Sequence, residues 1–149
     1  MGNMRVVTYR RRDGDAFPNK LYVNGVLVDE TALYAADTFS SGVNDLYLAN
    51  NGGAHLPGLV ASLQVYNRAL SDGGVAVGER AGGELLRSLM EYHNPPRAGL
   101  VCWLPMEEGV GGVTLDRSGN GNDGILEPVA NPPHWIRNRK WQLRAEARL

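Results

Sequence analysis

The stretch Leu115-Asp116-Arg117-Ser118-Gly119-Asn120-Gly121-Asn122-Asp123-Gly124 decides the fold class of this chain. Most of its residues are turn formers, because glycine reaches positive φ freely and Asn and Asp tolerate that region while bonding their own backbone. An apolar segment, 100–106, precedes it and a shorter one, 124–126, follows it. A strand, a Gly-rich link, a structured turn and another strand are typical of a β-sandwich.

The composition fits one turn-rich domain. The chain has 149 residues, with 19 Gly and 8 Pro, and is long enough to bury a core of its own. Its single cysteine, Cys102, excludes a disulfide within the chain, and its apolar surroundings predict a buried, inert thiol. No apolar run approaches ~20 residues and no charged segment precedes one, so we expect neither a membrane span nor a Sec signal peptide.

Charge is concentrated at the two ends of the chain. Residues 1–20 hold five Lys/Arg against two Asp (+3), residues 134–149 hold five against one Glu (+4), and the middle holds five Arg against thirteen acids (−8). Basic ends on an acidic body favour docking on a negatively charged partner, although two solvated surface segments are an equal alternative. Nucleic acid is not expected, because the acidic middle repels phosphate. The candidate partner-binding residues are Arg10, Arg11, Arg12, Arg137, Arg139, Lys140, Trp141 and Arg144.

Alternation and turn residues predict a series of strands around one helical segment. Asn24-Gly25 separates two β-rich runs and predicts a type I′ hairpin, which needs positive φ at both central residues. Between Ser71 and His93 we expect a broken helix, with Ser71-Asp72 as an N-cap and an apolar stripe over 84–92. The expected strands are 4–10, 21–23, 26–28, 45–49, 59–66, 100–106, one near Ile125 and one within 141–149, where a short helix is the alternative.

Four segments resemble laminin-G-like, concanavalin-A-type jelly rolls, namely Leu21–Val28, Gly58–Leu70, Gly99–Gly124 and Pro132–Trp135. The resemblance implies an all-β, two-sheet antiparallel jelly-roll-like sandwich with one short helix between its halves. As a single domain over 1–149, it would comprise a closing-strand half (1–70), a helical connector (71–98) and an opening-strand half (99–149).

The order of these segments is inverted relative to the family, and strands are missing. Three interpretations stay open, namely a circular permutant, a reduced sandwich that neighbouring copies complete, and the junction of two tandem domains. A sandwich that lacks strands leaves sheet edges open and an apolar face uncovered, and both favour pairing with another chain.

The turn is also a candidate calcium site. Asp116, Asn120, Asn122 and Asp123 place hard oxygen atoms in one Gly-rich loop, which suits Ca²⁺. The resemblance implies a further Asp early in the closing strand, where this chain has Ala61. The alternative is a turn that its own side chains stabilise without an ion. No other cofactor is expected, since the three histidines, His55, His93 and His134, have no zinc-ligand spacing.

The sequence offers no catalytic arrangement. Glu107 and Glu108 are adjacent, so their side chains point apart and cannot form the paired carboxylates of a glycosidase. We therefore expect a non-catalytic structural or interaction module rather than an enzyme. It would oligomerise or decorate a larger surface assembly such as a virus or phage particle, with other copies or other structural proteins as partners and no membrane contact. Its location would be extracellular or on a virion surface. The alternative is a carbohydrate-binding lectin-like module, with or without calcium.

Overall fold

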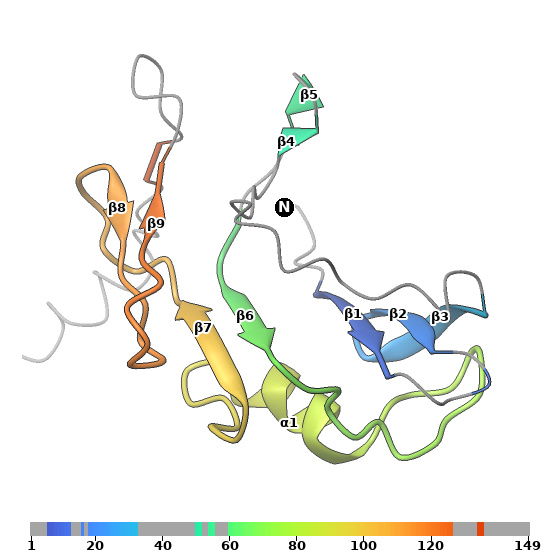
Figure 1. Cartoon of the computed structure of the whole chain (residues 1–149). Coiled ribbons are helices and arrows are strands. Elements are labelled where there is room, and N and C mark those ends of the chain that lie inside the picture. Colours follow the sequence, from blue (N-terminus) through green and yellow to red (C-terminus); the bar gives the residue numbers. More distant parts are fainter. Residues whose placement is uncertain are drawn as a thin grey trace, which may run out of the picture. The chain divides into compact units, whose positions relative to one another are not determined.

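The computed structural model describes residues 6–12, 16, 18–32, 50–51, 54–55, 60–126 and 134–135. Figure 1 shows its strands and its helix in chain order. The elements are β1 (Val7–Arg11), β2 (Asn19–Val23), β3 (Val26–Thr31), β4 (Asn50–Asn51), β5 (Ala54–His55), β6 (Leu63–Tyr66), α1 (Gly83–Met90), β7 (Leu100–Leu104), β8 (Val113–Thr114) and β9 (Gly124–Ile125).

The chain divides into two compact units, and each is described by itself. Unit 1 comprises Met1–Val60 and Tyr66–Gly99, and unit 2 comprises Ala61–Val65 and Leu100–Leu149. The division falls inside β6, which pairs with β7. This neighbourhood of β6 and β7 is visible in Figure 1.

Unit 1 is built on an antiparallel sheet in the order β1-β2-β3. The turn between β2 and β3 has φ of 52° at Asn24 and 78° at Gly25, so the predicted type I′ hairpin is confirmed. A Cβ at Gly25 would lie 3.0 Å from Cδ1 of Leu89. Glycine is therefore required there both by the backbone angle and by the helix that packs behind the turn.

The core of unit 1 lies on one face of this sheet. Tyr22 and Leu27 oppose each other across β2 and β3, and neither is exposed to solvent. The buried cluster comprises Tyr22, Leu27, Leu70, Ala81 and Leu85, with half-buried Tyr66, Val75 and Leu89 against it. Leu85 and Leu89 lie one turn apart on α1, so the predicted apolar stripe is the helix face that packs on the sheet.

The helix begins later than its expected N-cap. Residues 71–82 are not helical, since α1 begins at Gly83. Ser71 still caps it from a distance, because its Oγ accepts the Glu84 N–H at 3.1 Å and its carbonyl accepts the Leu85 N–H at 3.0 Å. The prediction of a helix within 84–92 is confirmed. The prediction that a helix begins directly after Ser71-Asp72 is wrong. The glycines between Ser71-Asp72 and α1 favour an irregular link over a helical one.

Unit 2 contains the two short pairs β6-β7 and β8-β9. Strand β7 is the most buried, with Cys102, Trp103 and Leu104 all less than a tenth exposed. Cys102 is a free buried thiol, as predicted. Burial, followed by the negative charges of Asp116 and Asp123, raises the pKa of this thiol.

The all-β class, with antiparallel pairing and a helix between β6 and β7, is confirmed. Packing of two sheets as a sandwich, and a single domain over 1–149, stay predictions. The strand expected over 59–66 is too long, because 60–62 are described and lie outside β6. Asn50 and Asn51 form β4, which pairs antiparallel with β5. The strands expected at 45–49 and 141–149 lie outside the described residues.

Candidate functional site

The turn at 115–124 is organised around the carboxylate of Asp116. Its Oδ1 accepts the backbone N–H groups of Trp103 at 2.9 Å and Ser118 at 2.8 Å. Its Oδ2 accepts the Ser118 hydroxyl at 2.8 Å and the Asn122 N–H at 3.0 Å. The neighbouring carboxylate of Asp123 accepts the N–H of Asp116 itself at 2.8 Å. Both acidic residues thus stabilise the turn directly.

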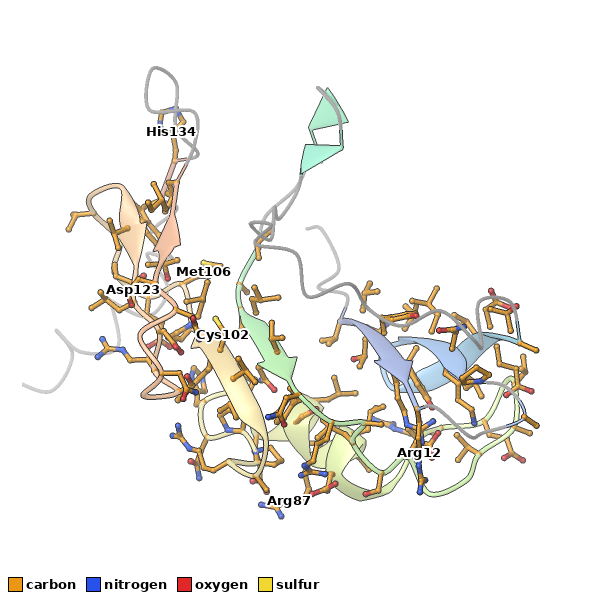
Figure 2. The ribbon with its side chains drawn as sticks, viewed as in Figure 1. Arg12, Arg87, Cys102, Met106, Asp123 and His134 are labelled. Carbon is orange, nitrogen blue, oxygen red and sulfur yellow. The ribbon has the colours of Figure 1, made fainter. Side chains whose placement is uncertain are left out.

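The amides of the same turn bond to the backbone of β7. The Val101 carbonyl accepts Nδ2 of Asn120 at 3.0 Å, Nδ2 of Asn122 at 2.9 Å and Oγ of Ser118 at 2.9 Å. Asn120 also reaches the Leu100 carbonyl at 3.1 Å. The turn therefore satisfies carbonyl groups along one edge of β7, which would otherwise be open to another strand. Figure 2 labels Cys102 on this strand and Asp123 in the turn.

These contacts bear on the calcium hypothesis. An ionised carboxylate has about four acceptor positions, and four donors already approach Asp116. Desolvation raises the pKa of Asp116, but the hydrogen bonds from Trp103, Asn122 and Ser118 outweigh it and hold the pKa at about 2. Within the described residues, no group of three His, Cys, Asp or Glu side chains could hold a metal ion. The geometry favours the turn that its own side chains stabilise, and calcium binding stays a prediction.

The acidic pair of the Gly-rich link is divided between two environments. Glu107 is exposed, whereas Glu108 is half-buried and its Oε1 accepts the Leu115 N–H at 2.9 Å. Desolvation opposes ionisation of Glu108, yet this bond and further hydrogen bonds lower its pKa. Glu108 therefore anchors the link to the start of the turn.

The basic segment of β1 is partly built into unit 1. Arg10 is only 6% exposed, donates from Nε to the Leu70 carbonyl at 3.0 Å and lies 3.7 Å from the carboxylate of Asp72. Lys20 reaches the same carboxylate at 3.4 Å, and the Tyr22 hydroxyl donates to it at 2.5 Å. We call Arg10, Lys20, Tyr22 and Asp72 the Asp72 cluster.

Burial and partners act in opposite directions inside the Asp72 cluster. Desolvation raises the pKa of Asp72, but hydrogen bonds from Tyr22 and Gly74 and the charges of Arg10 and Lys20 bring it to about 2. Burial and the same carboxylate raise the pKa of the Tyr22 phenol. Asp72 is thus ionised at neutral pH and holds two cations and a phenol. Local sequence patterns do not reveal this cluster, since its members are separated by up to sixty-two positions.

The other predicted partner-binding residues are placed only in part. Arg12 is exposed, and Figure 2 labels it just beyond the end of β1. The side chain of Arg11 lies outside the described residues, as do Arg137, Arg139, Lys140, Trp141 and Arg144. Trp135, at the end of the segment Pro132–Trp135, is described, and its Nε1 donates to the Gly111 carbonyl at 2.7 Å.

The face of the sheet opposite the core is apolar and open to solvent along β1. Alternation and the register place five apolar residues on it, which we call the outer face, namely Val7, Tyr9, Leu21, Val23 and Val26. Val7 is 65% and Tyr9 59% exposed, while the other three are half-buried. The Tyr9 hydroxyl donates to Oδ1 of Asn19 at 2.6 Å, which directs the ring along the sheet.

The two edges of this sheet differ. Beyond β3, Leu27 exchanges backbone hydrogen bonds with Gly78 (2.7 Å) and Glu79 (2.9 Å), and Val26 bridges to Arg80. Beyond β1, no strand of the described part of the chain continues the sheet. One edge is therefore covered by residues 78–80, while the other edge, β1, has no further strand paired to it among the described residues.

Comparison with known families identifies the class of fold. Residues 5–76 match a laminin G model described as the concanavalin A-like lectin/glucanases superfamily. The matched part, 72 of the 149 residues, includes β1, the hairpin, β6 and the Asp72 cluster, and is similar to that superfamily. Searches of curated proteins and of solved structures gave no significant match. None of the helical residues that the structure describes forms a segment with the length and apolarity needed to cross a membrane.

Proposed function

We propose that this chain is a non-catalytic interaction module that associates with copies of itself and with other structural proteins of a surface assembly. The observation that carries the proposal is the outer face, whose two β1 residues, Val7 and Tyr9, are both more than half exposed. Exposed apolar side chains that adjoin an open sheet edge favour a protein partner. The match to this superfamily is compatible with this role, since laminin-G-like domains are generally non-catalytic binding modules.

Four carboxylates of the described residues support the same role through what they contact. Asp116 and Asp123 hold the turn, and Asp72 holds Arg10, Lys20 and Tyr22. Glu84 makes a bidentate pair with Arg68 at 2.6 and 2.7 Å. Each of these carboxylates is engaged by groups of the chain itself and so contributes to folding. General acid–base catalysis needs a carboxyl group that can reach a substrate, so this use of the carboxylates supports a non-catalytic role.

The basic segments and the location extend the proposal. Arg12, with the basic residues of 136–149, would add contacts to an acidic surface of the assembly, and the chain would act outside the cell or on a virion or phage particle. Laminin-G-like domains are typically extracellular, which supports the first of these locations. Binding that depends on these charges should weaken as ionic strength rises.

The test is the mass of the protein in solution. Sedimentation velocity between about 1 and 100 μM should show an average mass that rises with concentration, because specific association involves a mass-action equilibrium. A chain that sediments as one compact monomer over the whole range contradicts self-association and leaves only binding to other proteins.

Carbohydrate binding is the second candidate, because the description of the matched superfamily includes lectins. A glycan array probed with and without Ca²⁺ separates three outcomes. Binding that requires calcium supports a calcium-assisted lectin, binding in both conditions supports a calcium-free lectin, and the absence of binding in both removes the candidate.

A further inference from the structure

The direction of the backbone groups of β1 can be read from its pairing with β2. The Val6 carbonyl accepts the Asn24 N–H at 2.8 Å, and the Arg12 N–H donates to the Pro18 carbonyl at 3.0 Å. In an antiparallel pair, alternate residues exchange hydrogen bonds with the neighbouring strand. Even-numbered residues of β1 therefore face β2, and Val7 and Tyr9 direct their N–H and C=O groups to the open edge. These same two residues carry the most exposed side chains of the outer face.

We propose that β1 is the self-association strand of this module, and that it pairs antiparallel with β1 of a second copy across a two-fold axis at Tyr9. This inference rests on the proposed function and specifies its interface. Pairing of identical edges is isologous, so it closes into a dimer rather than a filament. The two three-stranded sheets would become one continuous sheet whose outer faces lie side by side.

Charge selects this register. Full overlap of the five-residue strand places Tyr9 opposite Tyr9 of the second copy, Val7 opposite its Arg11 and Thr8 opposite its Arg10. Each arginine then meets an uncharged residue. A slip of two residues towards the C-terminal end would place the two copies of Arg10 opposite each other, and a slip of four would do the same for Arg11. Like charges directly opposite are destabilising, while aromatic pairs stabilise a sheet. Arg10 is further neutralised within its own copy by Asp72.

A second copy suits the β1 edge better than an unrelated strand does, because β1 itself carries both the apolar residues and the arginines that this register pairs. The β3 edge of this sheet is bonded to residues 78–80, and the β7 edge is bonded to the turn at 118–122. Strand β1 carries apolar Val7 and Tyr9 on one face, and Arg11 is the next alternate residue in its sequence. The strand that complements this pattern is β1 itself, reversed.

The register predicts opposite effects for opposite charges at one position. Val7→Lys places two like-charged pairs with Arg11 in the dimer and should weaken association by roughly fivefold or more, whereas Val7→Glu places two opposite-charged pairs there and should not weaken it. Val77→Lys and Val77→Glu are the controls, since Val77 is 52% exposed and lies outside the sheet. Dissociation constants are measured by sedimentation equilibrium.

A cross-link tests the two-fold axis independently. Hydrogen-bonded antiparallel pairs have Cα atoms about 5.5 Å apart, which suits a disulfide. Tyr9→Cys should therefore give a covalent dimer on mild oxidation, while Val77→Cys and the native chain, whose Cys102 is buried, should not. Association that neither Val7 variant changes, without a Tyr9→Cys dimer, overturns the β1 interface but leaves self-association intact. A wild-type chain that never associates overturns both.

Discussion

Tyr22 donates its hydroxyl hydrogen to Asp72 over 2.5 Å, although the two residues lie fifty positions apart. Tyr22 is on the central strand of the sheet, and Asp72 follows β6 in the segment that leads to α1. The bond therefore ties the connector to the buried face of the sheet. Arg10 and Lys20 approach the same carboxylate, so β1, β2 and the connector meet at one charge.

Removing the hydroxyl of this pair should be costly. Tyr22→Phe leaves a buried carboxylate oxygen without its closest donor, and we expect the free energy of unfolding to fall by about 2 kcal/mol. Urea denaturation measures it. Tyr92→Phe is the control, because Tyr92 is 39% exposed and should change the unfolding free energy by less than about 0.5 kcal/mol. Equal effects of the two substitutions would show that the bond contributes nothing specific.

The Asp72 cluster also predicts a pH dependence. Folding lowers the pKa of Asp72 from 3.8 to about 2, so the folded state favours its ionised form. That stabilisation is complete above pH ~5 and is lost as the pH falls through about 4 to about 2. The stability difference between wild type and Asp72→Asn should therefore shrink across this window. Thermal unfolding at pH 7, 4 and 2.5 measures it, and a constant difference would contradict the ionised assignment.

The hairpin turn predicts a strict requirement for glycine. Gly25→Val should destabilise unit 1 by more than about 1 kcal/mol, because φ of 78° strains a β-branched residue and its Cβ would crowd Leu89. Gly74→Val isolates the backbone strain, since Gly74 has φ of 72° with nothing within 4 Å. Gly112→Val, where space is open and φ is not positive, should be nearly neutral. The unfolding midpoint should be lowest for Gly25→Val, intermediate for Gly74→Val and highest for Gly112→Val.

Local signals predicted the parts of the fold that depend on neighbouring residues. Asn24-Gly25 predicted the hairpin because backbone angles are set within the dipeptide, and Leu85 and Leu89 predicted the helix face because its period is short. The limits of β6 could not be read from 59–66, since alternation continues where pairing with β7 stops. Hydrogen-bonded partners, and not periodicity, define the end of a strand.

The contacts that the sequence could not reveal join distant segments. Nothing near Ser71 indicates that its hydroxyl caps a helix whose Glu84 lies thirteen positions on, or that Glu84 pairs with Arg68. Arg10 was expected on a docking surface because it belongs to a run of three arginines. Only the folded chain shows that Arg10, the fourth of the five residues of β1, contacts the Leu70 carbonyl and the Asp72 carboxylate.

The candidate site at 115–124 gives the final prediction. The residues were identified correctly as a structured turn, but their polar types alone suit both an ion and a hydrogen-bonded loop. If Ca²⁺ bound with a dissociation constant of 10 μM, 1 mM would add about 2.7 kcal/mol and shift the melting temperature by several degrees. We expect a shift below about 1 °C, because four donors surround the Asp116 carboxylate.

Asp116→Ala completes that experiment. The substitution leaves the N–H groups of Trp103, Ser118 and Asn122 without their acceptor, so unit 2 should lose at least about 2 kcal/mol with or without calcium. Asp123→Ala removes one hydrogen bond, from the Asp116 N–H, and should cost less. A calcium-dependent rise in the melting temperature that Asp116→Ala abolishes would instead show that the ion displaces these donors, and the turn would then be a metal site.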